Sequence, residues 1–249
     1  MVEKFFVLLY YVIMKYDKNN ETSFAIGMFA TYEIVNTLPT QVVGVYYTKN
    51  IKMTDDVIAL FDFCKKQKIE LLERTRFVES LSGKENVHIV CEFKKYAQTL
   101  SAGNHLCLVN PSDMGNMGTI FRTSLGLGIK NIALITPCAD IFNPKVVRAS
   151  MGAIFKLNIE FFDSFEDYLS KFKGNQIFTF CLDGTQFLQQ TKVNNTKPFT
   201  LVFGNEATGL PDKVANMGTK IKIKQSKEID SFNLAISVAM AVYHFTSNI

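Results

Sequence analysis

Short apolar runs alternate with helical patterns along the second half of the chain, and this order restricts the fold more than any other feature. Runs with the length of buried strands occur at 106–110, 131–136, 176–182, 200–204 and 220–224. Helical patterns occur at 117–127, 144–151, 165–172, 212–217 and 231–245. Strands that alternate with helices in this way predict an α/β domain with a mainly parallel sheet.

The first half shows a similar alternation with different content. It predicts helices at 26–38, 55–66 and 76–81 and strands at 41–47, 69–72 and 87–91. A polar, small-residue-rich segment, 93–104, follows and is typical of a linker. We therefore predict a smaller N-terminal α/β domain at 1–100, built of βαβ units, and a larger one at 101–249.

The composition excludes several classes of protein. With 47% hydrophobic and 20% charged residues the chain is not disordered, and a net charge of +4 permits binding to a polyanion without requiring it. Five cysteines without paired spacing and three scattered histidines predict neither a disulfide framework nor a metal site, and they favour the cytoplasm. The apolar run 5–14 is too short to span a bilayer, and we expect a buried strand there.

The segment 110–123, NPSDMGNMGTIFRT, lies between a predicted strand and a predicted helix. It places Asn116 near the helix N-terminus, where free backbone N–H groups are found. Arg122 follows about one and a half turns later among apolar residues, so we expect it to meet a buried anion or reach a cleft. A helix cap with an arginine that reaches solvent is the alternative.

The segment 201–210, LVFGNEATGL, runs from an apolar strand directly into glycine, asparagine and glutamate. Ligands bind at the carboxyl ends of parallel strands, and glycine lets the backbone approach them closely. We therefore expect a binding loop here, although Glu206 could instead cap the helix predicted near residue 211.

The segment 221–245 predicts a helix with Ser231 as its N-cap and apolar residues nearly all round. Such a helix is buried in a core or in a subunit contact. Asn233 is the polar exception in its first turn, and we expect a buried amide that binds backbone or ligand.

Familiar nucleotide and hydrolase motifs are incomplete. Glycines 126 and 128 lack a third glycine at 131, and neither a phosphate-binding Gly-Lys-Ser/Thr nor a Gly-x-Ser-x-Gly occurs. The sequence thus argues against a dinucleotide fold, an NTPase and an α/β-hydrolase.

Taken in order, the three segments resemble the signature of the SpoU/TrmH family of RNA 2′-O-ribose methyltransferases, within the SPOUT superfamily. The resemblance is carried by 116–123, 203–210 and 231–237, includes 143–155, and covers residues 104–249. More faintly, the N-terminal part resembles the L30e-like substrate-binding domain that often precedes this catalytic domain. The order of its strands and helices supports that likeness, without a motif.

This resemblance implies a trefoil knot, a homodimer formed through the C-terminal helix, and S-adenosylmethionine as cofactor. The positions that match the family's cofactor site are Leu182, Asp183, Gly184, Phe203, Gly204, Asn205, Gly209, Ile223, Gln225, Phe232 and Asn233. Lys224 and Gln225 stand where many relatives have Pro-Met, which changes the expected contacts on the adenine side.

The implied reaction is methyl transfer to a ribose 2′-hydroxyl of ribosomal RNA or, less favoured, transfer RNA. Arg122 would act on the hydroxyl and its neighbouring phosphate, with Asn116, Ser231, Glu206 and Asn233 as the other catalytic residues. RNA contacts would come from Arg122, Lys145, Arg148, Lys65, Lys66 and Lys68. The alternatives are the same fold acting on a base atom, a small-molecule methyltransferase, and a catalytically inactive RNA-binding assembly factor.

Overall fold

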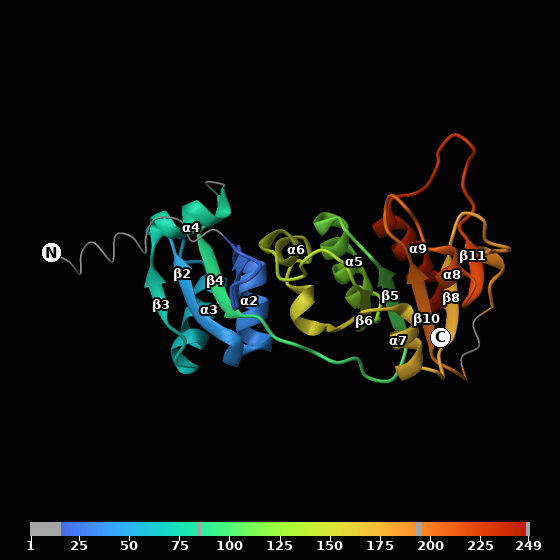
Figure 1. Ribbon diagram of the computed structural model, residues 1–249. Coiled ribbons are helices and arrows are strands. Elements are labelled where there is room, and N and C mark those ends of the chain that lie inside the picture. Colours follow the sequence, from blue (N-terminus) through green and yellow to red (C-terminus); the bar gives the residue numbers. More distant parts are fainter. Residues whose placement is uncertain (1–15, 84–85, 193–195, 248–249) are drawn as a thin grey trace. The chain divides into compact units, whose positions relative to one another are not determined.

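The computed structural model describes residues 16–83, 86–192 and 196–247, so the expected strand at 5–14 lies outside the described residues. The chain forms two compact units (Figure 1). Unit 1 contains the residues up to Tyr96 together with Asp140–Phe155, and unit 2 contains Ala97–Ala139 and the residues from Lys156 onward. Within the described ranges no helix combines the length and apolar character needed to cross a membrane.

Unit 2 is built on a seven-stranded sheet with the order β7-β6-β5-β10-β8-β11-β9. The strands are β5 (His105–Val109), β6 (Asn131–Ile135), β7 (Asn158–Phe162), β8 (Gln176–Phe180), β9 (Gln186–Phe187), β10 (Phe199–Phe203) and β11 (Thr219–Lys222). Every neighbouring pair is parallel, which confirms the predicted sheet. The sequence did not predict the edge strands β7 and β9, because the strands were predicted from continuous apolar runs, whereas polar residues interrupt β7 and β9 has two residues.

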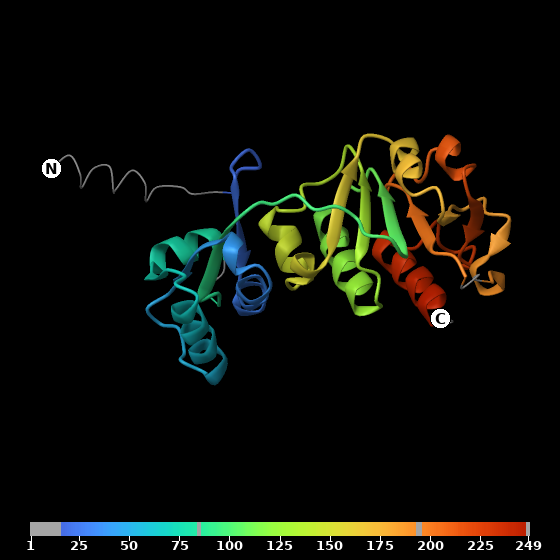
Figure 2. The same cartoon turned by 90° about the horizontal axis from the view of Figure 1, so that it is seen from below.

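Helices cover both faces of this sheet. They are α5 (Met114–Gly126), α7 (Phe165–Lys171), α8 (Asp212–Ala215) and α9 (Leu234–Thr246). In Figure 2, α5 and α9 lie side by side on one face, with α7 and α8 on the other. Beneath α7, Phe165 and Tyr168 pack on Cys107, Ala133 and Val202 of the central strands.

The N-termini of α5 and α9 differ from the prediction by three residues, in opposite directions. α5 begins at Met114 because the Asp113 carboxylate accepts a hydrogen bond from the Asn116 amide at 2.7 Å. α9 begins at Leu234 because the Asn233 side chain accepts one from the Ala235 amide at 2.8 Å. Asn116 lies in the first turn of α5, which confirms its predicted place near the helix N-terminus, whereas the expected Ser231 cap is wrong because Ser231 lies before α9.

Unit 1 contains a mixed sheet with the order β1-β4-β2-β3. Its strands are β1 (Thr22–Ile26), β2 (Val42–Tyr47), β3 (Leu71–Glu73) and β4 (Ile89–Lys94), and its helices include α2 (Met28–Thr37), α3 (Asp55–Lys66) and α4 (Thr75–Ser82). β4 is antiparallel to β1 and β2, whereas β2 and β3 are parallel around α3. The expected succession of βαβ units is thus limited to β2-α3-β3, and β4 extends into the segment predicted as a linker.

Residues 140–155 pack within unit 1 although the resemblance placed them in the catalytic part. They form α6 (Pro144–Ala149) and the start of a short 3-10 helix, η2 (Ala153–Lys156). The Ser23 hydroxyl of β1 donates to the Phe142 carbonyl, and the Phe93 ring of β4 meets the Phe155 ring edge-on at 5.2 Å. Aromatic side chains from this segment therefore complete the core beside β1 and β4.

Candidate functional site

A cavity of about 360 Å³ opens in unit 2 beyond the carboxyl ends of β8, β10 and β11. Its volume lies within the range of small-molecule sites, roughly 300–1,000 Å³. The predicted ligand residues that line it are Leu182, Asp183, Phe203, Gly204, Asn205, Gly209, Ile223, Gln225 and Phe232, together with Ser231 and Glu206. Gly184, Asn233, Asn116 and Arg122 do not line it.

The charged side chains that line the cavity are carboxylates. Asp183 and Glu206 line it, and none of the described lining residues is lysine, arginine or histidine. The Lys220 ammonium lies 3.0 Å from the Asp183 carboxylate, and this hydrogen bond holds the pKa of Asp183 below its usual value. Lys220 compensates the charge of Asp183, and internal donors occupy the Glu206 carboxylate, so the clearest electrostatic feature of the wall is that its described residues include no cation to bind a phosphate group.

Two glycines allow loops to cross the strands at the cavity. A Cβ atom at Gly204 would overlap the carbonyl carbon of Gly209, because Asn205 and Gly209 exchange backbone hydrogen bonds of 3.2 and 2.9 Å. At Gly184 a Cβ atom would lie 2.5 Å from the carbonyl carbon of Ile221 in β11. Gly184 therefore packs against β11 and does not line the cavity. The sequence alone could not distinguish this packing role from a ligand contact.

The Asn205 side chain shapes the loop that it belongs to. Its Oδ1 accepts hydrogen bonds from the amides of Ala207 at 2.9 Å and Thr208 at 3.2 Å. Its Nδ2 donates to the Asn110 carbonyl at 2.8 Å. The amide of Asn205 is thus used within the protein, and its contribution to the cavity is to hold 205–209 in place.

Glu206 connects this loop to the segment before α5. One carboxylate oxygen accepts from the amide and the hydroxyl of Ser112, at 3.1 and 3.0 Å, and the other accepts from the Asp113 amide at 3.2 Å. Burial alone would raise the pKa of Glu206, but hydrogen bonds from its own amide and from Ser112 and Asp113 outweigh it and lower the pKa. The alternative cap near residue 211 is not formed, since Pro211 precedes α8 without a side-chain cap.

Asn116 joins the three motifs to one another. Its Nδ2 donates to the Glu206 carboxylate at 3.4 Å, and its Oδ1 accepts from Asn233 Nδ2 at 2.9 Å. Asn233 is exposed, not buried as expected, because one end of its amide caps α9 while the other reaches Asn116. Segments separated by about ninety residues or more are thereby fixed beside the cavity.

Arg122 is exposed on α5, so of its two expected surroundings a buried anion is wrong, and the side chain reaches solvent as in the alternative interpretation. That it reaches a cleft stays a prediction. Its neighbours Ile120 and Phe121 are buried, and helical geometry turns Arg122 away from them. Within the described chain the guanidinium makes neither a hydrogen bond nor an ion pair, which leaves it available to an anion from solution.

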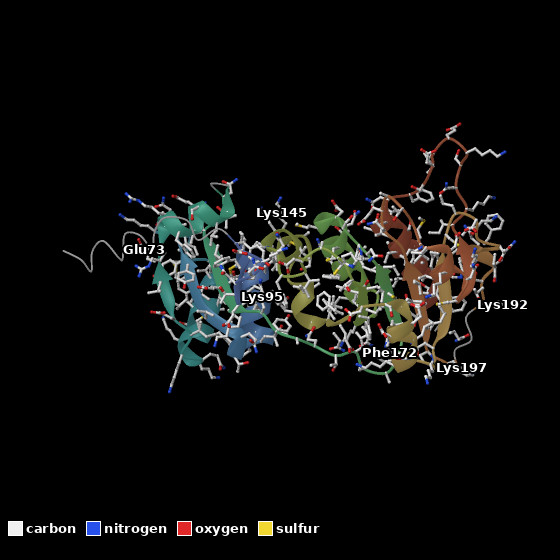
Figure 3. All side chains as sticks on the ribbon, viewed as in Figure 1. Glu73, Lys95, Lys145, Phe172, Lys192 and Lys197 are labelled. Atoms are coloured by element: carbon white, nitrogen blue, oxygen red, sulfur yellow. The ribbon has the colours of Figure 1, made fainter. Side chains whose placement is uncertain are left out.

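The predicted RNA-contact residues other than Arg122 belong to unit 1. Lys145 is exposed and Arg148 is half-buried, and both lie on α6 (Figure 3 labels Lys145). Lys65, Lys66 and Lys68, at the end of α3 and just after it, are exposed as well. Their contact with RNA stays a prediction.

Sequence reasoning missed several residues of the site. Ser112 and Asp113 bind Glu206, and the Ser-Asp pair before an apolar helical pattern is a capping signal that could have indicated them. The remaining wall is formed by Phe180, Cys181, Ala207, Thr208, Leu210, Ile221, Leu234 and Ser237. Burial raises the pKa of the Cys181 thiol to about 11, so it lines the wall as a neutral group.

These features define an α/β domain with a cavity of small-molecule size at the carboxyl edge of a parallel sheet and three motifs hydrogen-bonded beside it. Residues 103–243 match the model of the SpoU rRNA Methylase family, and the chain belongs to this family. It is 33% identical over 141 residues to an uncharacterized tRNA/rRNA methyltransferase of Synechocystis. This match covers 55% of this chain and 51% of the Synechocystis protein. The match thus spans about half of that relative's length.

Two further comparisons extend this finding. The chain is 25% identical over 164 residues to the 23S rRNA (guanosine(2553)-2′-O)-methyltransferase of Bacillus subtilis, covering 64% of each chain. It shares its fold with the crystal structure of an AdoMet-bound rRNA methyltransferase from Sinorhizobium meliloti, with a TM-score of 0.78 and 23% identity over 92% of this chain and 88% of that one. The likeness to that fold therefore includes most of unit 1.

Proposed function

We propose that this chain is an S-adenosylmethionine-dependent RNA methyltransferase that transfers a methyl group to a ribose 2′-hydroxyl of ribosomal RNA, or else of transfer RNA. The observation that carries the proposal is the cavity wall with two carboxylates and no cationic side chain among its described residues. S-adenosylmethionine bears a sulfonium and an ammonium group, whereas a nucleotide cofactor bears phosphates. Membership of the SpoU rRNA Methylase family and the name of the Bacillus relative support the same reaction.

The donor set of the cavity fits this ligand. Phe203, Ile223 and Phe232 supply apolar surface for an adenine ring, and Asp183 supplies a carboxylate for ribose hydroxyls. When bound, S-adenosylmethionine would supply an electrophilic methyl group to the ribose 2′-oxygen; the sulfonium would become a neutral thioether, and the hydroxyl proton would pass to water.

The chain's own residues would bind and orient the acceptor. Arg122 has a free guanidinium that suits a bidentate contact to phosphate and stabilises negative charge on the ribose oxygen. A guanidinium does not give up its proton in proteins, so Arg122 acts as an electrostatic group and not as a base. Asn116, fixed between Glu206 and Asn233, orients the acceptor together with Ser231 at the rim.

We further infer that unit 2 contains the trefoil knot and that the protein is a cytoplasmic homodimer through α9. The close crossing of Gly184 against β11 supports a knotted path. Ile236 and Tyr243 are 52% and 63% exposed and lie two turns apart on one face of α9, as expected for a subunit contact. The five cysteines are free thiols, which supports a reducing compartment.

The test is to incubate the protein with methyl-labelled S-adenosylmethionine and RNA from cells that lack its gene, and then to analyse the labelled nucleosides. We expect a 2′-O-methyl nucleoside, and the RNA fraction that contains it identifies ribosomal or transfer RNA. Label on a base would favour the base-methylating alternative. An absence of label with cofactor binding intact would favour an assembly factor.

Arg122→Ala separates catalysis from cofactor binding. We expect the variant to lose methyl transfer while its dissociation constant for S-adenosylmethionine, measured by calorimetry, stays within about twofold of wild type, because Arg122 does not line the cavity. Lys173→Ala removes another exposed cation from unit 2 and should retain activity. Loss of both binding and transfer in Arg122→Ala would contradict the assignment.

A further inference from the structure

Asn110 has an unusual backbone conformation at the edge of the sheet where the cavity opens. It directly follows β5, and its φ of 53° lies in the left-handed region that non-glycine residues rarely adopt. Asparagine is among the side chains that tolerate this region, and such residues gather at functional sites. The left-handed conformation thus explains why asparagine stands at position 110, a residue to which the proposed function assigns no catalytic role.

On one side Asn110 is hydrogen-bonded to the connection that follows β6. Its amide donates to the Ile135 carbonyl at 3.1 Å, and its side-chain Nδ2 donates to the Pro137 carbonyl at 3.2 Å. The next residue, Pro111, accepts from the Ala139 amide at 2.8 Å. Backbone and side chain together therefore anchor residues 110–111 to the neighbouring strand end.

On the other side Asn110 holds the cavity loop. Its carbonyl accepts the 2.8 Å hydrogen bond from Asn205 Nδ2, and the left-handed turn sends the chain on to Ser112 and Asp113, which bind Glu206. Both Asn205 and Glu206 are thus held by the four residues that begin at Asn110.

The geometry points to Asn110 as a positioning residue that fixes the cavity loop 205–209 relative to the first turn of α5. It touches neither the cavity nor a reacting group and acts through Asn205 and the path of 110–113. The expected effect of Asn110 on S-adenosylmethionine affinity rests on the proposed function, whereas its expected effect on the loop 205–209 is independent of that function.

Two substitutions separate the side chain from the backbone. Asn110→Gly keeps access to the left-handed region and removes the bond to Pro137, while Asn110→Ala also disfavours that region. Met151→Ala is the matched control, because Met151 has a φ of 51° and lies in unit 1. Methionine tolerates the left-handed region no better than alanine, so Met151→Ala changes a side chain at such a position without changing its backbone preference. Thermal unfolding first confirms that both alanine variants fold.

The loop is measured by hydrogen exchange without any ligand. The amides of Ala207 and Thr208 are protected by Asn205 Oδ1, and we expect them to exchange about tenfold faster in Asn110→Ala and less so in Asn110→Gly. In Met151→Ala their exchange should equal that of wild type. Equal exchange in wild type and Asn110→Ala would overturn the inference.

Calorimetry with S-adenosylmethionine is the second measurement. We expect the dissociation constant to rise about tenfold in Asn110→Ala and to stay within about twofold in Met151→Ala, since loss of one hydrogen bond changes an equilibrium by this order. Wild-type affinity in Asn110→Ala would overturn the link to binding. If wild type itself fails to bind, the proposed function is wrong, while the exchange experiment still decides the role of Asn110.

Discussion

Glu206→Gln replaces one carboxylate oxygen by an amide nitrogen and nearly preserves the size of the side chain. In the structure one oxygen accepts from the Ser112 amide and hydroxyl and from Asn205 Nδ2, and the other accepts from the Asp113 amide and Asn116 Nδ2. All five are donors in this arrangement. Whichever way the glutamine amide is turned, its nitrogen therefore faces at least two donors that lose their acceptor.

Hydrogen bonds to a charged group contribute about 1.5–3 kcal/mol each, but water can replace part of this at Ser112 and Asp113, which are exposed. We therefore expect Glu206→Gln to lower the free energy of unfolding by about 2 kcal/mol, roughly a thirtyfold change in the folding equilibrium. The folded protein should also bind S-adenosylmethionine more weakly, because the loop 205–209 loses its attachment to α5.

The pH dependence of this difference follows from the lowered pKa of Glu206. A carboxyl whose pKa is lower in the folded state stabilises the fold above its unfolded value of about 4.3, and this stabilisation is lost as pH falls through the folded value. Urea denaturation from pH 7.5 downward should show wild type and Glu206→Gln converging as pH falls from the unfolded value through the lower folded pKa. Glu79→Gln, on an exposed carboxylate of α4, is the control and should follow wild type throughout.

A difference below about 0.5 kcal/mol at pH 7.5 between wild type and Glu206→Gln would refute this reasoning, because surface substitutions without a specific role fall within that range. A difference that does not change with pH would also refute it, since the lost interaction would then not depend on the charge of Glu206.

Two further predictions concern a glycine and a histidine of unit 2. Gly204→Ala should abolish cofactor binding in calorimetry, because the added methyl group overlaps the carbonyl carbon of Gly209, and unchanged affinity would show that the loop adjusts. His105 is fully buried, and its ring donates a hydrogen bond to the Ser101 carbonyl and accepts one from the Tyr168 hydroxyl. Burial lowers the pKa of His105, although the hydrogen bond to Ser101 opposes this shift. The stabilisation by neutral His105 is therefore complete above its unfolded pKa of about 6.5 and is lost as pH falls. The free energy of unfolding of wild type should thus decrease more between pH 7.5 and 5.5 than that of His105→Gln. Equal decreases in the two proteins would contradict this prediction.

Local patterns were sufficient to predict much of the secondary structure. The helix expected at 55–66 is α3 at the same residues, because an amphipathic pattern follows a Thr54 cap. Helix starts were less predictable at α5 and α9, where two polar residues competed for the cap. Asp113 and not Asn116 caps α5, and Asn233 and not Ser231 caps α9. Which residue forms the cap depends on tertiary contacts such as the hydrogen bond between Asn116 and Asn233.

The alternation of strands and helices, the parallel sheet of unit 2 and the three motifs could be predicted from the sequence, because periodicity and motif spacing are properties of neighbouring residues. Tertiary structure alone decided which motif residues meet. β10 lies between β5 and β8, and this order brings Glu206 to Ser112, 94 residues away along the chain. It also decided that 140–155 packs with unit 1. Such pairings depend on how the whole chain buries its apolar surface, and no local pattern encodes that outcome.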